Sequence, residues 1–482
     1  MKITQVSNIN KTQYELDFVD IDIAVDNSLF IDPYFLSQRN DYWAINASRT
    51  IKSFFQYIVT LISNGNLSEA KDLFSHLGEP NETCLGMSRG MPQGRGVGKK
   101  DSFRIFESLL DSKAVQTGLV EDLEDCKIFV DKVDKDKISD MTTNIIRKHL
   151  IDYTIQQCNL WQIPLQDGIP SGFFWNRDEG RWQNIYSKML VIGYKKIILV
   201  PKSIVSYKQQ YTAQKYHQHY ILNFLQNEHL RMGSLLVQRR VRKNGSINEF
   251  VTKKDIKESE APFSKEYLRT FTQKHPSVFE NFKLDNKKKV RSISNEEIGA
   301  TNLSQVTDHL INQLSNTPSG NKHATIYHRI TVGILELLFY PNLTCPQIEQ
   351  EIHEGRKRID IAFDNAATNG FFFRLHTTYQ TPSQFILVEC KNYSSDLENP
   401  ELDQIAGRFS LHKGKFGFIV CRKIDDLELF LSRCKDTYKD GRGVIIPLVD
   451  LDLVSLLSEL KNGNNAVVED FLSNRFRLIA LN

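Results

Sequence analysis

The run FILVECK (385–391) closes a strongly apolar segment with two charged residues, Glu389 and Lys391. Successive side chains of a strand point to opposite faces, so these two share one face while Cys390 takes the other. Glutamate and lysine are rarely buried unless they are paired, yet both end a run that is apolar enough for a core strand. The sequence therefore predicts a buried strand that ends in a carboxylate and an ammonium group, which together can hold a metal ion and position a water molecule.

Two further acids lie upstream of this strand. Asp360 falls in EGRKRIDIAF, which indicates a turn followed by a strand with Asp360 on the face opposite the isoleucines. Glu336 lies in IYHRITVGILELLF, a predicted helix that is apolar on almost every side. Because such a helix is mostly buried, Glu336 needs a partner. Downstream, PELDQIAGRFSLH predicts a helix that carries Gln404 and Arg408.

The order of elements is a helix with glutamate, a hairpin with aspartate, a strand with Glu-x-Lys, a helix with glutamine, and then strand–helix repeats. From roughly Ala324 onward, this order resembles the PD-(D/E)XK, or restriction-endonuclease-like, nuclease superfamily. Two departures are visible. Ile359 stands before the aspartate in place of proline, and the interval to Glu-x-Lys is longer than in compact members. The resemblance implies an α/β domain with a central mixed sheet flanked by helices.

The resemblance also implies an activity, a cofactor and roles for single residues. It implies a hydrolase of phosphodiester bonds that depends on Mg²⁺, with Mn²⁺ as a substitute, and that leaves 5′-phosphate and 3′-hydroxyl ends. Asp360 and Glu389 would hold the ion, often joined by Glu336. Lys391 would act on the attacking water. Gln404 corresponds to a helix residue that some branches of the superfamily add.

The chemistry of these residues agrees with that expectation. Phosphodiester hydrolysis needs an in-line water and neutralisation of charge at the phosphate, and Mg²⁺ held by one or two carboxylates supplies both. Asp360 and Glu389 offer such oxygens, and the backbone carbonyl of Cys390 could give a third. Lys391 can position the water.

Each of these residues also has an ordinary interpretation. Glu389 and Lys391 could form an ion pair at the end of a strand. Asp360 could pair with an arginine of the turn before it, and Arg329 or another base could neutralise Glu336. Gln404 could simply face water, as most helix glutamines do. The combination is therefore more informative than any one member.

The formal net charge of +3 is unevenly distributed. Between Arg231 and Arg291 there are 16 lysines and arginines against 7 acids, interleaved with aromatic residues. Basic and aromatic side chains suit a phosphate backbone and stacked bases, although a solvated connector has the same composition. The residues predicted to bind nucleic acid, in this stretch and in the turn before Asp360, are Arg239, Arg240, Arg242, Lys243, Lys287, Lys288, Lys289, Arg356 and Arg358.

A chain of 482 residues is long enough for several domains. The predicted organisation is a mixed α+β region over 1–230 that recognises substrate or senses a trigger, a basic helical connector and linker over 231–320, and the nuclease-like domain over 321–482. The small and polar residues of SNTPSGNKHAT mark the last boundary.

The composition predicts a cytoplasmic protein without a membrane segment. No apolar run approaches the length of a membrane span, and the first residues do not resemble a signal peptide. The 7 cysteines form no CxxC pair, so they indicate reduced thiols in place of a zinc finger or a disulfide framework.

The acidic stretch LDFVDIDIAVDNSLFIDP (16–33) alternates apolar and acidic residues and predicts one or two strands. Two interpretations remain open for its aspartates. They could form a second metal site, or they could lie on acidic turns beside a half-exposed strand. The aspartates are Asp17, Asp20, Asp22, Asp26 and Asp32.

Taken together, these features predict a metal-dependent DNA endonuclease. Large bacterial chains that end in such a domain often serve restriction or anti-phage defence, so the resemblance extends to that role by analogy. It also implies a homo-oligomer and a possible partner protein from a defence system. A ribonuclease that uses the same site, and a non-catalytic scaffold that binds nucleic acid, remain as alternatives.

Overall fold

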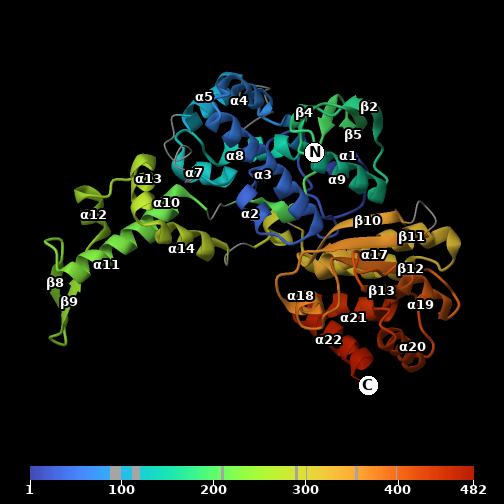
Figure 1. The fold of residues 1–482 in the computed structure, drawn as a ribbon. Coiled ribbons are helices and arrows are strands. Elements are labelled where there is room, and N and C mark those ends of the chain that lie inside the picture. Colours follow the sequence, from blue (N-terminus) through green and yellow to red (C-terminus); the bar gives the residue numbers. More distant parts are fainter. Residues whose placement is uncertain are drawn as a thin grey trace.

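The computed structural model describes residues 1–86, 99–110, 120–207, 211–287, 291–299, 301–352, 357–397 and 399–481. Figure 1 shows three parts: a largely helical N-terminal region, an arm that extends to one side, and a C-terminal part built on a sheet. The N-terminal region contacts the C-terminal part where α9 meets β10.

The N-terminal region consists of helices and several small sheets. Its longest helix, α3 (Tyr42–Ser63), begins at Asp41, whose Oδ1 accepts a hydrogen bond from the Ala44 N–H. The other helices are α1 (Ile3–Val6), α2 (Pro33–Ser37), α4 (Leu67–Leu73), α5 (Lys99–Leu110), α7 (Cys126–Phe129), α8 (Lys135–Ile145) and α9 (Arg147–Trp161). The strands are β1 (Phe30–Ile31), β2 (Gln166–Pro170), β3 (Phe174–Asn176), β4 (Arg181–Gln183), β5 (Tyr186–Ile192), β6 (Lys195–Ile197) and β7 (Val205–Ser206).

The acidic stretch over 16–33 differs from its predicted strands. Only the two residues of β1 form a regular strand there, paired with β7. The physical reason is that aspartates of this stretch are buried and hydrogen-bonded, so they do not form the solvent-exposed face of a strand. Asp20, for example, accepts hydrogen bonds from the backbone N–H and the hydroxyl of Thr4. The prediction of one or two strands therefore holds only for the two residues of β1.

The arm comprises residues 213–287 (Figure 1). Its elements are α10 (Ala213–Tyr216), a π-helical turn (His217–Ile221), α11 (Leu222–Met232), β8 (Gln238–Val241), β9 (Ile247–Phe250), α12 (Lys253–Ser259), α13 (Lys265–Lys274) and α14 (Pro276–Lys287). The predicted connector is thus largely helical, but β8 and β9 form a hairpin that was not predicted. The turn passes through Lys243 and Asn244, because the Gly245 N–H donates to the Arg242 carbonyl, and Gly245 follows with a φ of +81°.

The rest of the predicted connector joins the C-terminal part. After α15 (Asn295–Ile298), helix α16 (Leu303–Asn316) packs against α17 (Ala324–Phe339) and α21 (Asp450–Lys461). Within the described residues, no helix combines the length and the apolar character that crossing a membrane requires.

A five-stranded sheet forms the centre of the C-terminal part, in the order β10-β11-β12-β13-β14. Strands β10 to β12 are antiparallel neighbours, whereas β12 to β14 are parallel neighbours. The strands are β10 (Leu343–Ile352), β11 (Lys357–Asn365), β12 (Phe385–Lys391), β13 (Phe416–Cys421) and β14 (Val444–Val449). The further helices are α18 (Gly370–Thr377), α19 (Asn399–Ala406), α20 (Leu427–Lys439) and α22 (Val467–Ala480). The predicted mixed sheet flanked by helices is confirmed.

Helices α17 and α19 cover opposite faces of this sheet. Gly417 lies beside Leu387, and a Cβ at Gly417 would lie 2.8 Å from the Ile405 side chain of α19. The next residue, Phe418, points to the other face and stacks on Phe339 of α17 with ring centroids 5.4 Å apart. Because side chains alternate along β12, Leu387 shares the α19 face with Glu389 and Lys391.

Candidate active site

Three predicted residues meet at the end of β12. Lys391 Nζ donates hydrogen bonds to Glu389 Oε1 at 2.7 Å and to Gln404 Oε1 at 2.9 Å. The exposed fractions of Lys391 and Glu389 are 8 % and 1 %. Gln404 reaches Lys391 because α19 covers this face of the sheet. The ammonium group is therefore held in place by two oxygen atoms and does not turn freely in solvent.

Asp360 joins them from the neighbouring strand. Ile361 of β11 lies opposite Val388 of β12 in an antiparallel register, so Asp360 falls beside Glu389. Its Oδ2 accepts a hydrogen bond from the Cys390 N–H at 3.0 Å. Asp360 is half-buried, whereas Glu389 is fully buried.

Arg408 is a fifth member of the site, and no role was predicted for it. It follows α19, is 8 % exposed, and its guanidinium contacts Glu389 Oε2. Burial lowers the pKa of Arg408, and the negative charge of Asp360 works in the opposite direction. A positive charge thus stands next to both carboxylates. The available signal was its place four residues after Gln404 in the predicted helix, although α19 ends at Ala406, two residues before Arg408. We call these five residues the Glu389 group: Asp360, Glu389, Lys391, Gln404 and Arg408.

A histidine reaches the same strand end from the other face. His328 of α17 is half-buried, and its Nε2 donates to the backbone carbonyl of Cys390 at 3.3 Å. This is the carbonyl that was predicted as a third metal ligand. No pattern in the sequence singled out His328, since it lies in a helix that is apolar on almost every side.

Glu336 does not lie with the Glu389 group, which corrects its predicted place in the site. Its Oε1 is 3.1 Å from Lys202 Nζ, and both side chains are completely buried. Burial raises the pKa of Glu336, Lys202 opposes this rise, and Asp17 adds to it. The reason is geometric. Glu336 is about two helical turns beyond His328, on a helix that covers the opposite face of the sheet from Glu389. The alternative of neutralisation by a base is confirmed, and the base is Lys202.

Most of the predicted nucleic-acid ligands lie on the arm, whereas Arg356 and Arg358 come directly before Asp360 in the chain. Arg239, Arg240, Arg242 and Lys243 are exposed on the β8–β9 hairpin, and Lys287 is exposed at the end of α14. Arg239 pairs with Glu249, and Arg242 donates to Asn248. Outside the described residues and side chains lie Lys288, Lys289, Arg356 and the side chain of Arg358.

The Glu389 group offers the oxygen ligands that a hard divalent cation prefers. Asp360, Glu389 and the Cys390 carbonyl are such donors. Lys391 and Arg408 already hold the two oxygens of Glu389, so a cation that binds Glu389 must displace the Arg408 guanidinium. The donor chemistry therefore fits Mg²⁺, and Arg408 is the side chain that would have to move.

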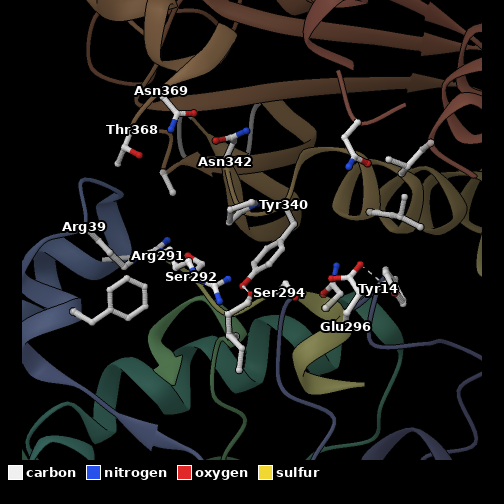
Figure 2. Close-up of a pocket in the computed structure, with 18 of the residues that line it drawn as sticks. Tyr14, Arg39, Arg291, Ser292, Ser294, Glu296, Tyr340, Asn342, Thr368 and Asn369 are labelled. Carbon is white, nitrogen blue, oxygen red and sulfur yellow. Dashed lines mark hydrogen bonds between the residues drawn. The ribbon is translucent and has the colours of Figure 1, made fainter. Parts of the chain in front are cut away.

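A pocket of about 550 Å³ lies elsewhere, between the N-terminal region, the segment before α15, and the loops that follow α17 and β11 (Figure 2). Arg39 and Arg291 line it, but Arg39 pairs with Asp41 at 2.7 Å and Arg291 with Glu297 at 2.9 Å. Its described lining contains no member of the Glu389 group. We place the candidate site at the Glu389 group because charged side chains converge there, whereas the two arginines that line the pocket are already paired with acids.

Comparison with known proteins adds one match. Residues 8–212 match the family model described as "Domain of unknown function (DUF8370)". No curated protein and no solved structure matches the chain. The matched segment is the N-terminal region, and it ends at Thr212, where the arm begins. The sheet that carries the Glu389 group lies outside it.

Proposed function

We propose that this protein is a Mg²⁺-dependent nuclease that hydrolyses phosphodiester bonds of DNA at the Glu389 group. The observation that carries the proposal is the placement of Lys391. Its ammonium group is fixed by Glu389 and Gln404 at a strand end, beside the half-buried Asp360. A lysine that only stabilised the fold would not need a second carboxylate on the adjacent strand.

The order of elements supports a restriction-endonuclease-like assignment. Helix α17 precedes the antiparallel strands β10 to β12, and α19 then leads to β13, which is parallel to β12. This is the order that the resemblance in sequence leads one to expect. Asp360 and the Glu-x-Lys pair fall on adjacent strands of that sheet, at one end.

In the proposed reaction the residues of the chain bind, orient and neutralise. Asp360 and Glu389 would hold Mg²⁺, which supplies neutralisation of phosphate charge and a more acidic water. Lys391 would orient the attacking water by hydrogen bonding, because Glu389 and Gln404 fix its Nζ. Arg408, once released from Glu389, would contact a phosphate oxygen and balance its charge.

The arm supports binding to a nucleic-acid backbone. Arg240 and Lys243 are exposed on the β8–β9 hairpin, and neither side chain makes a hydrogen bond or ion pair with another described residue. Unpaired cations on an extended element suit a polyanion, since they can neutralise phosphates and release counterions. A two-stranded ribbon of this kind also has the width to enter a major groove.

Plasmid cleavage tests the proposal. Supercoiled DNA, single-stranded DNA and RNA would be incubated with the wild type and with Lys391→Ala, each with Mg²⁺, Mn²⁺ or EDTA. We expect metal-dependent cutting of DNA by the wild type and none by the variant. Lys423→Ala is the matched control, because Lys423 follows β13 in the same domain and only forms an exposed pair with Asp425 at 2.9 Å.

The other outcomes separate the alternatives. Cutting of RNA in preference to DNA would make the protein a ribonuclease that uses the same site. Cutting that survives in Lys391→Ala would remove the Glu389 group from the reaction. Binding without cutting by either protein would favour a non-catalytic scaffold. The contact between Arg408 and Glu389 is the observation that favours such a scaffold, since the guanidinium occupies the carboxylate oxygen that a metal ion would need.

A binding measurement tests the arm separately. The double variant Arg240→Glu and Lys243→Glu should weaken DNA binding about equally for all sequences. It should also reduce the slope of log affinity against log salt by roughly 1 for each phosphate that the hairpin no longer neutralises. Lys439→Glu on α20 is a control with the same change of charge per residue. Equal affinity of the hairpin variant and the wild type would make the hairpin a solvated surface.

A further inference from the structure

A second group of polar side chains is buried where the N-terminal region meets the sheet. One ligand atom from each of Asp41, Cys345 and Asp364 lies within 4.8 Å of the other two, and no other three histidine, cysteine or acidic residues of the described chain come as close. Their exposed fractions are 1 %, 2 % and 3 %. Asp41 precedes α3, Cys345 lies on β10 and Asp364 on β11, so three separate elements supply the atoms.

Local structure explains why the two carboxylates converge. Asp41 Oδ1 accepts from the Ala44 N–H at 3.1 Å, and Asp364 Oδ2 accepts from the Trp43 N–H at 2.9 Å. Both acids therefore cap the first turn of α3. Asp41 does so as the residue that precedes the helix, and Asp364 does so from the sheet. Each carboxylate oxygen keeps a lone pair after such a bond, and these can still coordinate a cation.

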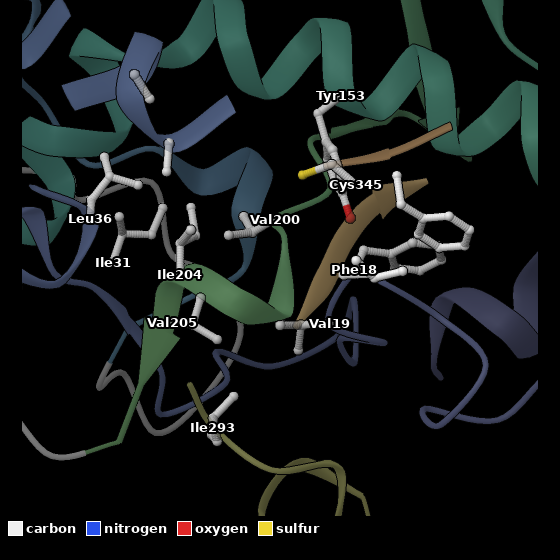
Figure 3. Close-up of a cluster of buried hydrophobic side chains, with 14 of the residues drawn as sticks. Phe18, Val19, Ile31, Leu36, Tyr153, Val200, Ile204, Val205, Ile293 and Cys345 are labelled. Carbon is white, nitrogen blue, oxygen red and sulfur yellow. The ribbon is translucent and has the colours of Figure 1, made fainter. Parts of the chain in front are cut away.

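A fourth acid approaches the same place without a complete set of partners. Asp17 is 1 % exposed, and its Oδ2 accepts from the hydroxyl of Tyr153 at 2.7 Å. Its carboxylate also lies against the backbone N–H of Cys345. Its Oδ1, however, is buried and has no hydrogen-bond partner among the described residues. Figure 3 shows Cys345 and Tyr153 next to one another, between β10 and α9. Asp17 thus has an unused buried oxygen beside the thiol.

The charges around these residues do not balance. Arg39 pairs with Asp41 at 2.7 Å, and Lys202 pairs with Glu336 at 3.1 Å. Among the described residues, neither Asp17 nor Asp364 then has an ion pair of its own. A buried carboxylate without a counter-charge costs several kcal/mol, so such a group either takes up a proton or binds a cation.

We propose that Asp41, Cys345 and Asp364 bind one Zn²⁺ ion, and that the unpartnered oxygen of Asp17 moves in as the fourth ligand when the ion binds. We call these four residues the Asp364 group. The mixture of ligands selects the metal. A thiolate is a soft ligand that Zn²⁺ accepts, whereas Mg²⁺ prefers oxygen and keeps several waters. Cys345 would release its thiol proton to solvent on binding.

The ion would serve as a structural link. The site is closed to solvent, and structural zinc sites are closed four-coordinate sites. Asp17 and Asp41 come from the N-terminal region, and Cys345 and Asp364 from the sheet, so the ion would tie the two parts together. The inference is independent of the proposed nuclease, because it concerns different side chains and a different metal.

Metal content of the full-length protein tests it. Wild type, Cys345→Ser, Asp364→Asn and Cys434→Ser would each be loaded with Zn²⁺, freed of excess by gel filtration, and measured by mass spectrometry of the metal. We expect about one zinc per chain in the wild type and none in the first two variants. Cys434→Ser should keep the ion, because Cys434 is a buried thiol on α20 outside this group.

A second set of measurements uses the wild type alone, so it does not depend on whether a variant folds. Co²⁺ loaded into the wild type should give a thiolate-to-cobalt charge-transfer band, and a chelator should remove the zinc and lower the melting temperature of the wild type. Added Zn²⁺ should restore it, and Mg²⁺ should not. Zinc in equal amounts in wild type and Cys345→Ser would overturn the proposal. So would a wild type that takes up no zinc and gives no cobalt band.

Discussion

Strand β11 carries two aspartates on one face, Asp360 and Asp364, in surroundings of opposite character. The two are four residues apart, so about 13 Å of strand separates them. Around Asp360, the acids are matched by the cations of Lys391 and Arg408. Around Asp364, acids outnumber cations and the only adjacent ion pair among the described residues is that of Arg39 with Asp41. One strand thus joins a balanced group to an acid-rich group.

The surroundings of each aspartate decide what its group can bind. Asp360 is half-buried, and Lys391 and Arg408 balance the acids of the Glu389 group, so a cation that displaces Arg408 keeps the charge of Glu389 matched. Asp364 is 3 % exposed and its neighbours are fixed by backbone hydrogen bonds. A group of that kind cannot admit a large substrate. It needs a proton or a small cation, and it serves stability.

The largest difference between the two groups should appear when the negative charge of each aspartate is removed. Asp360→Asn should lower the rate of DNA cleavage by about 1,000-fold, which corresponds to about 4 kcal/mol of lost transition-state stabilisation, because the amide cannot hold the cation. Asp364→Asn should keep most of the activity and lose about 2 kcal/mol of stability. Cleavage rates and urea unfolding of both variants provide the two readings.

The reverse pattern would contradict the roles given to the two aspartates. If Asp364→Asn lost cleavage at full stability, the acid-rich group would be part of the reaction. If Asp360→Asn unfolded without a change in the rate per folded molecule, Asp360 would be a structural acid.

A second prediction concerns Arg408. Arg408→Met removes one of the two cations that hold Glu389 and leaves that buried carboxylate with Lys391 alone. Loss of one partner of a buried pair costs about 3 kcal/mol, so the variant should unfold at lower urea. Arg408→Lys is the control, because it keeps the charge and loses only the planar fork. A loss below about 1 kcal/mol would mean that Glu389 was never balanced by Arg408.

The strands of the sheet could be predicted from the sequence because buried strands are continuously apolar. FILVECK is β12, and the predicted strand–helix repeats that follow begin with β13. The placing of Glu389 and Lys391 on one face followed from alternation alone. The position of Gln404 near these two residues could be predicted because its helix comes directly after this strand. These parts of the site depend on local pattern, and local pattern is what a single sequence carries.

The missing parts depend on contacts between distant segments. Helix α17 is apolar on almost every side, so its sequence could not tell which face would meet the strand end. The structure turns His328 toward Cys390 and Glu336 toward Lys202, which belongs to the N-terminal region. The side chain of Arg408 lies beyond the end of α19 at Ala406, so helical spacing did not fix its direction. Tertiary packing decided each case.

Asp140 tests whether burial alone sets the behaviour of an acid without a counter-charge. It lies on α8, is 7 % exposed, and its side chain makes no hydrogen bond or ion pair with another described residue. Burial, and then the nearby acids led by Asp136, raise its pKa from 3.8 to about 8. The folded protein therefore holds this proton more tightly than the unfolded chain. The resulting stability is complete below about pH 4 and is lost as the pH rises through 8.

Replacing Asp140 by Asn should remove this dependence. Between about pH 5.5 and pH 8.5, the wild type should lose about 3 kcal/mol more stability than Asp140→Asn, as measured by urea unfolding at both pH values. Asp178→Asn, at a side chain that is 86 % exposed, is the control and should follow the wild type. Parallel losses in the wild type and Asp140→Asn would show that the carboxyl is ionised at no cost.

The smallest expected effect on catalysis is that of Glu336→Gln. The residue resembles a catalytic glutamate in sequence, but its carboxylate pairs with Lys202 on the far face of the sheet. Cleavage per folded molecule should therefore change by less than about twofold, equal to roughly 0.4 kcal/mol. Stability should fall, because Lys202 would remain buried without its counter-charge. A loss of cleavage as large as that of Asp360→Asn, at unchanged stability, would return Glu336 to the site. It would also mean that the two ends of β11 act as one group.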